Sequence, residues 1–382
     1  MENILILNHT GWLGGAELSL LRYLERTKIP REKILCVANR SGPLLGEIKR
    51  LGYRIHPLSI PVPGLQKSPW KKASSWVRLS WTILELAAIV KKHDIGILYA
   101  NSHRSAFPLL VLRTIFPGLR LVTHVRDRID GNLKRNMVVS KTDKIIAISD
   151  YVALNLGIDI TGNGKLKKIP SGIDAVKLED TAGREEVIRE LGIPQGSFVF
   201  GMFCQVLPWK GVREYIEASL ETIRNCEHAY SIMVGDDSFS GQTGYFREVK
   251  RKVKEGGMDG RIHFTGFKRD VERYLSCVDV VVSASLEEPL GQTLLQAMAM
   301  GKPVIATKSG GPLEIVSDSE TGLLVEPGDI TALGEAMNWF YQHQDEAKKM
   351  GERGKERFYR LFLTAGEMAE KIDEVLIETQ TS

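Results

Sequence analysis

Glu288 and Gln296 lie eight positions apart in the stretch SLEEPLGQTLLQAMAMGKPVIA, residues 285–306, and this spacing could do chemistry. A carboxylate accepts hydrogen bonds from the hydroxyls of a ligand, whereas an amide can accept from one hydroxyl and donate to another. The two side chains could therefore hold the two hydroxyl-bearing ends of one elongated molecule.

The elements around this stretch are expected to place it at the edge of a sheet. VDVVVSAS is typical of a buried strand, EEPLG of a loop, QTLLQAMAM of a helix that Gly301 ends, and PVIAT of the following strand. Glu288 would then lie in the loop at the carboxyl edge, with the N–H groups of Gly291, Gln292 and Thr293 exposed at the helix start. Backbone donors between a carboxylate and an amide suit a phosphate between two sets of hydroxyls, which is the description of a nucleotide sugar.

Lys210 is a second candidate in the same half of the chain. FCQVLPWKG places it shortly after a strand and at the start of a helix, where an ammonium and backbone donors converge on a phosphate. A solvated surface lysine is the competing interpretation. The next strand ends in Asp236 and Asp237. Adjacent residues in an extended turn point apart, so no metal site is predicted there.

Two further candidates follow strands in the first half of the chain. Gly14 and Gly15 in HTGWLGGAE lie at the mouth of a helix, where paired glycines let the backbone approach an anion. Their spacing does not match G-x-G-x-x-G, and a Gly-Gly turn is more often only a tight connection. His124 ends RLVTHV, where an imidazole could hydrogen-bond a sugar hydroxyl or assist proton movement, and a structural role weighs slightly more.

The candidates all follow apolar runs that alternate with segments of helical period. In the first half these runs are NILILN, KILCVAN, RIHPLSI, IGILYAN, RLVTHV and DKIIAIS. After residue 195 they are SFVFGMF, YSIMVG, RIHFTGF, VDVVVSAS, KPVIATKS and GLLVEPG, and from about residue 329 the chain reads as helices only. This pattern predicts an α/β protein with two doubly wound parallel sheets, whose ligands bind outside the carboxyl ends of the strands.

The boundary between the two sheets is expected near IPSGIDAVKLED, residues 169–180, where Pro170 and Gly172 end one pattern. The 382 residues, 43% hydrophobic and 26% charged, are enough for two domains. No secretory signal is expected, and the apolar runs are too short to span a bilayer. Four cysteines without C-x-x-C spacing argue against a disulfide framework and a zinc site, so the cytoplasm is the expected location.

The charge is divided unevenly along the chain. Residues 1–170 contain 27 Lys and Arg against 12 Asp and Glu, a net charge of +15, and residues 171–382 contain 24 against 35, a net charge of −11. The first half is therefore expected to meet an anionic partner, unless the two halves are only solvated surfaces of opposite sign.

A basic and aromatic segment in the first half sharpens this expectation. LQKSPWKKASSWVRLSW interleaves basic residues with tryptophans: Lys67, Lys71, Lys72 and Arg78 with Trp70, Trp76 and Trp81. Such a pattern favours a helix on the anionic inner face of a membrane, although Trp76, Leu79 and Ile83 also have the spacing of a buried helix face. Nucleic acid is not expected, because no base-reading module is evident.

The sequence resembles the retaining family 4 glycosyltransferases of the GT-B fold (glycosyl transferases group 1) over nearly its whole length. The motifs that carry the resemblance are HTGWLGGAE, IPSGID, QVLPWKG, VGDD, RIHFTGF, EEPLGQTLLQAMAMGKPVIATKSGGPLEIV and ETGLLVEPGD. The resemblance implies two Rossmann-like domains facing across a cleft: residues 1–172, with a C-terminal helix of about 362–382 that crosses back, for the acceptor, and residues 173–361 for a UDP- or GDP-sugar.

The resemblance also implies a role for each matching residue of the second domain. Glu288 would face the hexose, Lys210 would neutralise the diphosphate, and the backbone of Leu290, Gly291, Gln292 and Thr293 would cradle a phosphate. Two positions depart from the family pattern: Gln205 replaces an arginine, and Gln296 replaces the carboxylate that holds the ribose. Both are kept as donor-binding candidates. Glu314 would begin a short helix nearby, where a structural role is equally frequent.

In the first domain the resemblance places His124 against the sugar and Gly14 and Gly15 beside the donor phosphate or the acceptor. The acceptor site itself is not identified by the motifs, and Gly15, Glu17 and Arg126 are its candidates. The catalytic set implied by the family is thus His124, Lys210 and Glu288.

The chemistry implied is hexosyl transfer with retention, without metal or cofactor, to a lipid-linked or polysaccharide acceptor in cell-envelope or surface-glycan synthesis. Two alternatives remain open. Gln205 and Gln296 are compatible with a catalytically silent relative that binds a nucleotide sugar or a partner enzyme. A sugar-nucleotide epimerase or a phosphorylase on the same scaffold is disfavoured, because an acid/base carboxylate set and a cofactor-lysine segment are not evident.

Overall fold

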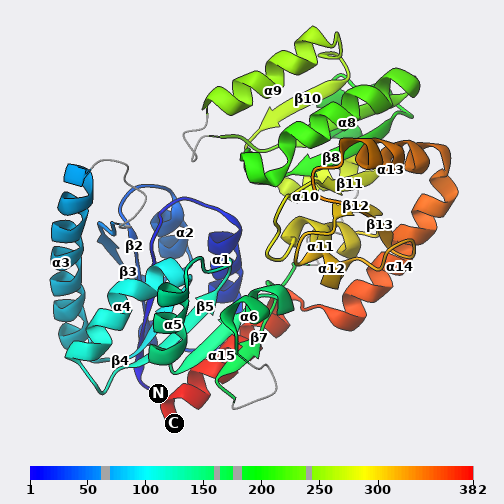
Figure 1. The fold of residues 1–382 in the computed structure, drawn as a ribbon. Helices are drawn as coiled ribbons and strands as arrows, with labels where there is room; N and C mark the ends of the chain where they lie inside the picture. Colours follow the sequence, from blue (N-terminus) through cyan, green and yellow to red (C-terminus); the bar gives the residue numbers. More distant parts are fainter. Residues whose placement is uncertain (62–68, 159–163, 175–182, 238–242, 382) are drawn as a thin grey trace. The chain divides into compact units, whose positions relative to one another are not determined.

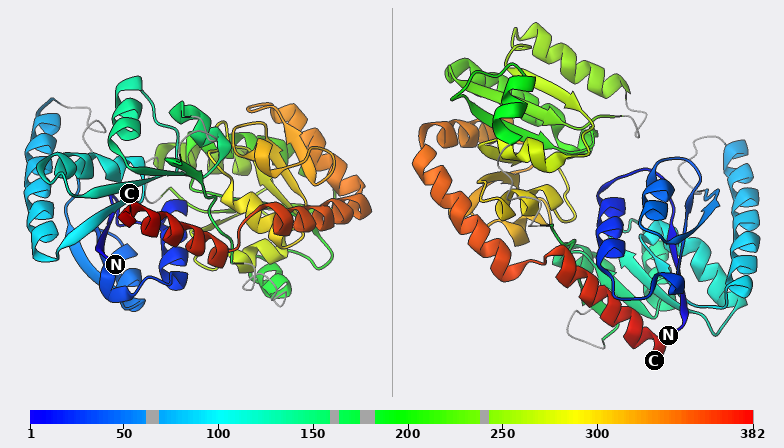
Figure 2. Two further views of the ribbon diagram at one scale, coloured as in Figure 1. Left: turned by 90° about the horizontal axis from the view of Figure 1, so that it is seen from below. Right: turned by 180° about the vertical axis from the view of Figure 1, so that it is seen from behind.

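The chain folds into two compact units, Met1–Gly172 with Ala365–Ser382 (unit 1) and Ile173–Thr364 (unit 2). The computed structural model describes residues 1–61, 69–158, 164–174, 183–237 and 243–381, without the side chains of residues 69–75, Thr243 and Thr381. Figures 1 and 2 show that each unit consists of one twisted sheet with helices on both of its faces.

Unit 1 is built on a seven-stranded sheet in the order β3-β2-β1-β4-β5-β6-β7, and every pair of neighbours is parallel. Its strands are β1 (Asn3–Asn8), β2 (Ile34–Asn39), β3 (Arg54–Leu58), β4 (Ile95–Ala100), β5 (Arg120–Val125), β6 (Lys144–Ala147) and β7 (Leu166–Lys168). The central strands are almost continuously buried, as expected for parallel strands covered on both faces. Six of the seven strands confirm the sequence prediction.

Strand β7 is the one that the sequence analysis missed. It has only three residues, LKK, and pairs with β6 through Ile145 and Leu166 at the edge of the sheet. Only Leu166 of the three is buried, so the strand has no apolar run and leaves no periodic signal.

Helices cover both faces of the sheet in unit 1. They are α1 (Gly15–Arg26), α2 (Leu44–Arg50), α3 (Pro69–Lys92), α4 (His103–Ile115), α5 (Asn132–Lys141), α6 (Asp150–Leu156) and, from the C-terminal end of the sequence, α15 (Ala365–Thr381). None of the helices in the described part of the chain combines the length and the apolar composition that crossing a bilayer requires.

Helix α15 is anchored on α1 by a buried carboxylate. Asp373 accepts hydrogen bonds from the Tyr23 hydroxyl at 2.9 Å, from the Thr27 hydroxyl at 2.6 Å and from the Lys28 N–H at 2.8 Å. Three donors compensate the cost of burying the charge. The last helix is therefore an integral part of unit 1, which confirms the expectation that the chain crosses back to its first domain (Figure 1).

The exposure of Trp76 on α3 differs from the interpretation that Trp76 and Leu79 both belong to a buried helix face. Leu79 is buried, as a core position requires, but Trp76 is 61% exposed and does not belong to the core. Lys67 and the side chains of Trp70, Lys71 and Lys72 lie outside the described residues.

Unit 2 contains a six-stranded parallel sheet in the order β10-β9-β8-β11-β12-β13. Its strands are β8 (Phe198–Phe203), β9 (Ala229–Val234), β10 (Ile262–Gly266), β11 (Val280–Ser283), β12 (Val304–Thr307) and β13 (Gly322–Val325). All six confirm the sequence prediction. The order puts β8 directly beside β11, so the loops after these two strands are neighbours.

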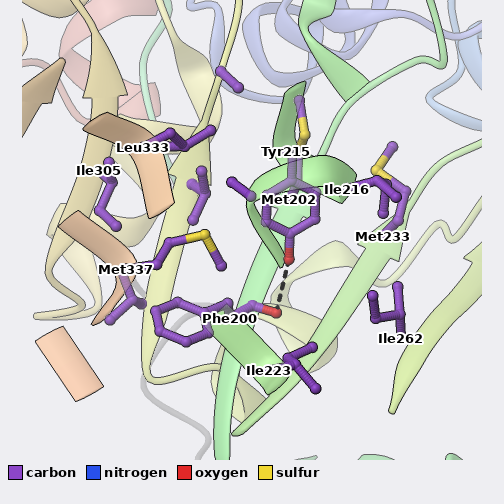
Figure 3. Close-up of a cluster of buried hydrophobic side chains, with 14 of the residues drawn as sticks. Phe200, Met202, Tyr215, Ile216, Ile223, Met233, Ile262, Ile305, Leu333 and Met337 are labelled. Carbon is purple, nitrogen blue, oxygen red and sulfur yellow. Dashed lines mark hydrogen bonds between the residues drawn. The ribbon is translucent and has the colours of Figure 1, made fainter. Parts of the chain in front are cut away.

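The helices of unit 2 are α7 (Gly183–Glu190), α8 (Val212–Asn225), α9 (Thr243–Glu255), α10 (Val271–Cys277), α11 (Gln292–Ala299), α12 (Pro312–Ile315), α13 (Ile330–Gln342) and α14 (Gln344–Leu361). Figure 3 shows part of the core under α8 and α13, with Phe200, Tyr215 and Met337 fully buried. The Tyr215 hydroxyl donates to the carbonyl oxygens of Phe200, at 3.1 Å, and of Ile232, at 3.2 Å. The hydrogen-bonded hydroxyl lets a large ring fill this core without leaving a buried polar atom unsatisfied.

Candidate active site

The carboxyl edge of the sheet in unit 2 brings together a lysine and a glutamate that are 78 positions apart in sequence. Lys210 ends a short 3-10 helix after β8, and Glu288 lies in the loop after β11. The Lys210 Nζ is 2.6 Å from the Glu288 Oε2, and the two side chains are only 17% and 12% exposed. A pair so little exposed is weakly screened by solvent, so each charge holds the other in place.

A glycine permits the close approach of the two loops. Gly211, which follows Lys210, has a φ of +72°, and a Cβ at this position would lie 1.8 Å from the carbonyl oxygen of Ala284, just after β11. Both the backbone conformation and the space therefore require glycine. The turn that carries Lys210 is thereby pressed against the end of β11, next to Glu288.

Glu288 is fixed by its surroundings as well as by Lys210. Ser285 donates its hydroxyl to the same Oε2 at 3.1 Å. The backbone N–H of Glu288 donates to the carbonyl of Ser309 at 2.9 Å, and the N–H of Gly311 donates to the carbonyl of Glu288 at 2.8 Å. The loop after β11 is thus tied to the loop after β12, and the carboxylate is preorganised.

Helix α11 starts next to this carboxylate. Its N-cap Gly291 has a φ of +99°, and the Thr293 hydroxyl donates to the carbonyl of Phe203 at 3.2 Å, which ties the helix to the end of β8. The first amides of a helix have no acceptor inside the helix and carry partial positive charge. The arrangement of Lys210, Glu288 and this helix start can bind an anionic group next to a hydroxyl-bearing one.

The two glutamines of the sequence prediction differ in environment. Gln205 is exposed just after β8, whereas Gln296 is only 7% exposed in the second turn of α11. Within the described residues neither side-chain amide has a hydrogen-bond partner. Leu290 is 4% exposed, so any contact of this residue with a ligand would come from its backbone.

The sheet edge of unit 1 carries a buried carboxylate at the glycine turn. Glu17 is 5% exposed; its Oε1 accepts from the Asn8 amide at 3.1 Å, and its Oε2 accepts from the Gly14 N–H at 3.0 Å. Burial raises the pKa of this carboxyl group. Glu17 therefore stabilises the turn of Gly14 and Gly15 at the start of α1, and contact with an acceptor stays a prediction.

His124 and Arg126 share a buried network. His124 is fully buried within β5, and its Nδ1 lies 2.7 Å from the Tyr99 hydroxyl and 3.2 Å from Arg126 Nη2. Arg126, just beyond the strand, donates to the Asn101 carbonyl at 3.0 Å and to its side-chain oxygen at 2.9 Å. Burial, followed by the charge of Arg126, holds the pKa of His124 well below its usual value.

This network fixes the tautomer of His124. A guanidinium can only donate, so the Nδ1 facing Arg126 is an acceptor, and the proton of the neutral ring is on Nε2. The Nε2 atom has no hydrogen-bond partner within the described residues. His124 is thus a neutral donor inside the sheet layer, and its predicted contact with a sugar remains untested.

Several polar residues at this edge were not found by the sequence analysis. His9 Nδ1 lies 3.1 Å from the hydroxyl of Ser102, the N-cap of α4, and the His9 N–H donates to the Ser105 hydroxyl at 3.0 Å. Burial, with a smaller effect of Arg104, lowers the pKa of His9 to about 4. In unit 2, Ser285 was missed as well. His9 and Ser285 follow the ends of β1 and β11 closely, which is the signal that could have identified them.

The comparisons with known proteins agree with this architecture. Residues 183–357 match the family described as glycosyl transferases group 1. The lipopolysaccharide core biosynthesis glycosyltransferase LpsE of Rhizobium meliloti is 37% identical over 199 residues, which are 52% of this chain and 50% of LpsE. The mannosyltransferase LpsB of the same organism is 26% identical over 62% of this chain and 67% of LpsB. The matches thus span about half to two thirds of these curated relatives.

Solved structures are similar over the whole chain. Anabaena Alr3699/HepE in complex with UDP-glucose is 22% identical, covers 99% of this chain and 100% of its own, and has a TM-score of 0.83. Sucrose-phosphate synthase from Thermosynechococcus elongatus is 19% identical, covers 100% of both chains, and has a TM-score of 0.80. Together with the two parallel sheets, these findings establish that the chain has the GT-B fold and that its residues 183–357 match the glycosyl transferases group 1 family.

Proposed function

We propose that this protein is a retaining, nucleotide-sugar-dependent glycosyltransferase of family 4. It would transfer a hexosyl-type sugar from a UDP- or GDP-sugar to a lipid-linked or polysaccharide acceptor in cell-envelope or surface-glycan synthesis. The observation that carries the proposal is the Lys210–Glu288 pair at 2.6 Å beside the start of α11. A cation, a carboxylate and helix amides at one sheet edge match a diphosphate that is joined to a hydroxyl-rich sugar.

The proposed chemistry assigns one task to each group. Lys210 and the first amides of α11 stabilise the negative charge that the diphosphate gains as its bond to the anomeric carbon breaks. Glu288 accepts hydrogen bonds from the hexose hydroxyls and orients the ring. The acceptor oxygen attacks the same face and transfers its proton to the departing phosphate, so no separate nucleophile, metal or cofactor is required.

The names of the relatives support the substrate classes. LpsE and LpsB are named for lipopolysaccharide core biosynthesis, and the HepE structure contains UDP-glucose. From these names we infer that this chain also uses a nucleotide-sugar donor and a glycan acceptor. Unit 1 would bind the acceptor through its sheet edge, where Gly15, Glu17 and Arg126 lie, and the enzyme would act in the cytoplasm, on the inner face of the membrane.

Nucleotide release from a panel of UDP- and GDP-sugars, with and without a lipid-linked oligosaccharide, tests this proposal. We expect one donor to release its nucleotide slowly by hydrolysis when it is alone and faster by sugar transfer when the acceptor is present. The NMR spectrum of the glycoside product should show the anomeric configuration of the donor. An inverted product would contradict the retaining mechanism. Tight donor binding without turnover in the presence of acceptor would instead identify a catalytically silent relative.

The neutral side chain of Gln205 favours this second candidate, because position 205, just after β8, does not supply a positive charge for the phosphate. We expect Gln205→Arg to tighten UDP binding about tenfold, since a charge-assisted hydrogen bond to phosphate replaces a neutral one. Isothermal titration calorimetry measures the effect. Gln344→Arg on the exposed start of α14 is the matched control, because it adds the same charge away from Lys210. An equal gain in both variants would contradict a phosphate contact at position 205.

A further inference from the structure

Helix α3 has an apolar side that faces solvent. Its exposed residues Trp76, Val77, Trp81 and Leu84 are 61%, 60%, 70% and 61% exposed. The opposite side is buried against unit 1 and consists of Leu79, Thr82, Leu86, Ile89 and Val90. Val77, Trp81 and Leu84 follow one another at spacings of four and three, which places them on one side of the helix, and Trp76 directly precedes Val77. The four exposed residues therefore form one apolar stripe. Contiguous exposed apolar surface of this kind marks an interaction site.

The charges around the stripe are almost all positive. Within its bounds, α3 contains five basic residues and one acidic residue. The single carboxylate, Glu85, lies 2.9 Å from His56 Nε2 on neighbouring strand β3. Arg78 and Lys92 are exposed beside the stripe. The partner of this surface is therefore expected to be anionic as well as apolar.

We propose that α3 docks unit 1 onto an anionic lipid bilayer, with Trp76 and Trp81 inserted at the level of the headgroups. Indole rings prefer the interface between headgroups and acyl chains, because they have an apolar body and one N–H donor. A helix that lies flat in this interface has an apolar side flanked by Lys and Arg, as α3 has. Figures 1 and 2 show α3 lying along the outer flank of unit 1.

The charge pattern distinguishes a bilayer from a protein partner. Unit 1 is basic, since residues 1–170 carry a net charge of +15 and residues 365–382, with five acidic residues and one basic residue, reduce it only to +11. This charge repels a second copy of the same surface. An anionic leaflet attracts it, and each Lys or Arg near the surface adds to binding. The inference extends the proposed action at the inner face of the membrane, but it is tested by lipid binding alone, without any sugar transfer.

Cosedimentation of the full chain with vesicles of phosphatidylcholine, with or without phosphatidylglycerol, tests the inference. We expect binding only to the anionic vesicles, weakened by salt. Trp76→Ser with Trp81→Ser should lower the partition coefficient by about tenfold or more, because two large apolar side chains no longer insert. Arg78→Gln with Lys92→Gln should lower it by roughly tenfold as well, and more at low salt. Tryptophan quenching by brominated lipid should disappear largely in the first variant.

Leu154→Ser is the matched control, because Leu154 on α6 is 73% exposed and lies outside the stripe. Its binding should equal that of the native chain, and circular dichroism should show all variants folded. Absence of binding to anionic vesicles at low salt would overturn the proposal, as would unchanged binding of the tryptophan variant. A change from dimer to monomer in that variant would identify a second copy as the occupant. Glu288→Ala should still bind vesicles, so a failure of sugar transfer can be told from a failure of docking.

Discussion

Glu288→Gln is expected to slow sugar transfer by two to three orders of magnitude and, at the same time, to tighten the binding of UDP. The first effect follows from the role proposed for Glu288, because an amide would replace the charged acceptor that orients the sugar in the transition state, a loss of about 10² to 10³ in rate for one such group. The second follows because the Lys210 ammonium, now 2.6 Å from a carboxylate, becomes available to phosphate.

Turnover and calorimetry on the same preparations separate these effects. UDP should bind several-fold more tightly to the variant, whereas the UDP-sugar should gain less, because it would also lose the hydrogen bonds that we propose it makes to Glu288. Glu287→Gln removes the same charge one position earlier and should leave both values near those of the native chain. Equal weakening of UDP and UDP-sugar would mean that Glu288 only stabilises the loop, which would refute its assignment to the sugar.

Acidification is expected to unfold unit 1 before unit 2. Burial, with a smaller effect of Arg104, lowers the pKa values of both His9 and His103 to about 4, and burial also holds the pKa of His124 well below its usual value. The folded state keeps these rings neutral, while the unfolded chain protonates them near pH 6.5. Their contribution to stability is therefore complete above pH 6.5 and is lost as the pH falls towards 4, on the order of 3 kcal/mol for each of His9 and His103.

One carboxyl group in unit 1 acts in the opposite direction. Burial raises the pKa of Glu17, so its contribution is present below pH 4.5 and is lost as the pH rises through the folded-state value. Within the described part of unit 2, only His263 has a lowered histidine pKa. Unit 1 therefore still has more histidines with a lowered pKa than unit 2, and it is expected to unfold first.

Hydrogen exchange followed by mass spectrometry between pH 7 and pH 4 resolves the two units by their peptides. Peptides of β1, β4 and β5 should lose protection before those of β8 and β11. His103→Gln should make the stability of unit 1 less dependent on pH over this range, whereas His343→Gln, an exposed position in unit 2, should change nothing. Simultaneous loss of protection in both units would contradict the assignment of the acid response to the buried histidines.

The sequence was sufficient to predict the strands that are almost fully buried. β1, β8 and the other central strands consist mainly of apolar residues because both of their faces are covered, and this composition is visible without a structure. The edge strand β7 buries little and consists of LKK, so its pairing depends on β6 and not on its own residues. The order of strands in each sheet is likewise a property of tertiary packing.

The candidate site was predictable as a set of residues but not as an arrangement. Each candidate follows a strand, and the sheet edge collects such residues. The ion pair of Lys210 and Glu288, however, exists because β8 lies beside β11, which no local pattern specifies. The burial of His124 was not predictable from the sequence either. His124 is the second-last residue of β5 and is fully buried, whereas Arg126, only two positions later, lies just beyond the strand.

The return of the chain to unit 1 has a consequence for biosynthesis. Because α15 is held by Asp373 on α1, unit 1 is not complete until residues 365–381 have left the ribosome. Unit 2, Ile173–Thr364, is synthesised entirely before that moment and can close its own core first. The N-terminal part of the chain therefore cannot complete its packing before α15 is available, and a ribosome that stalls before α15 leaves the surface of α1 that binds α15 open to chaperones.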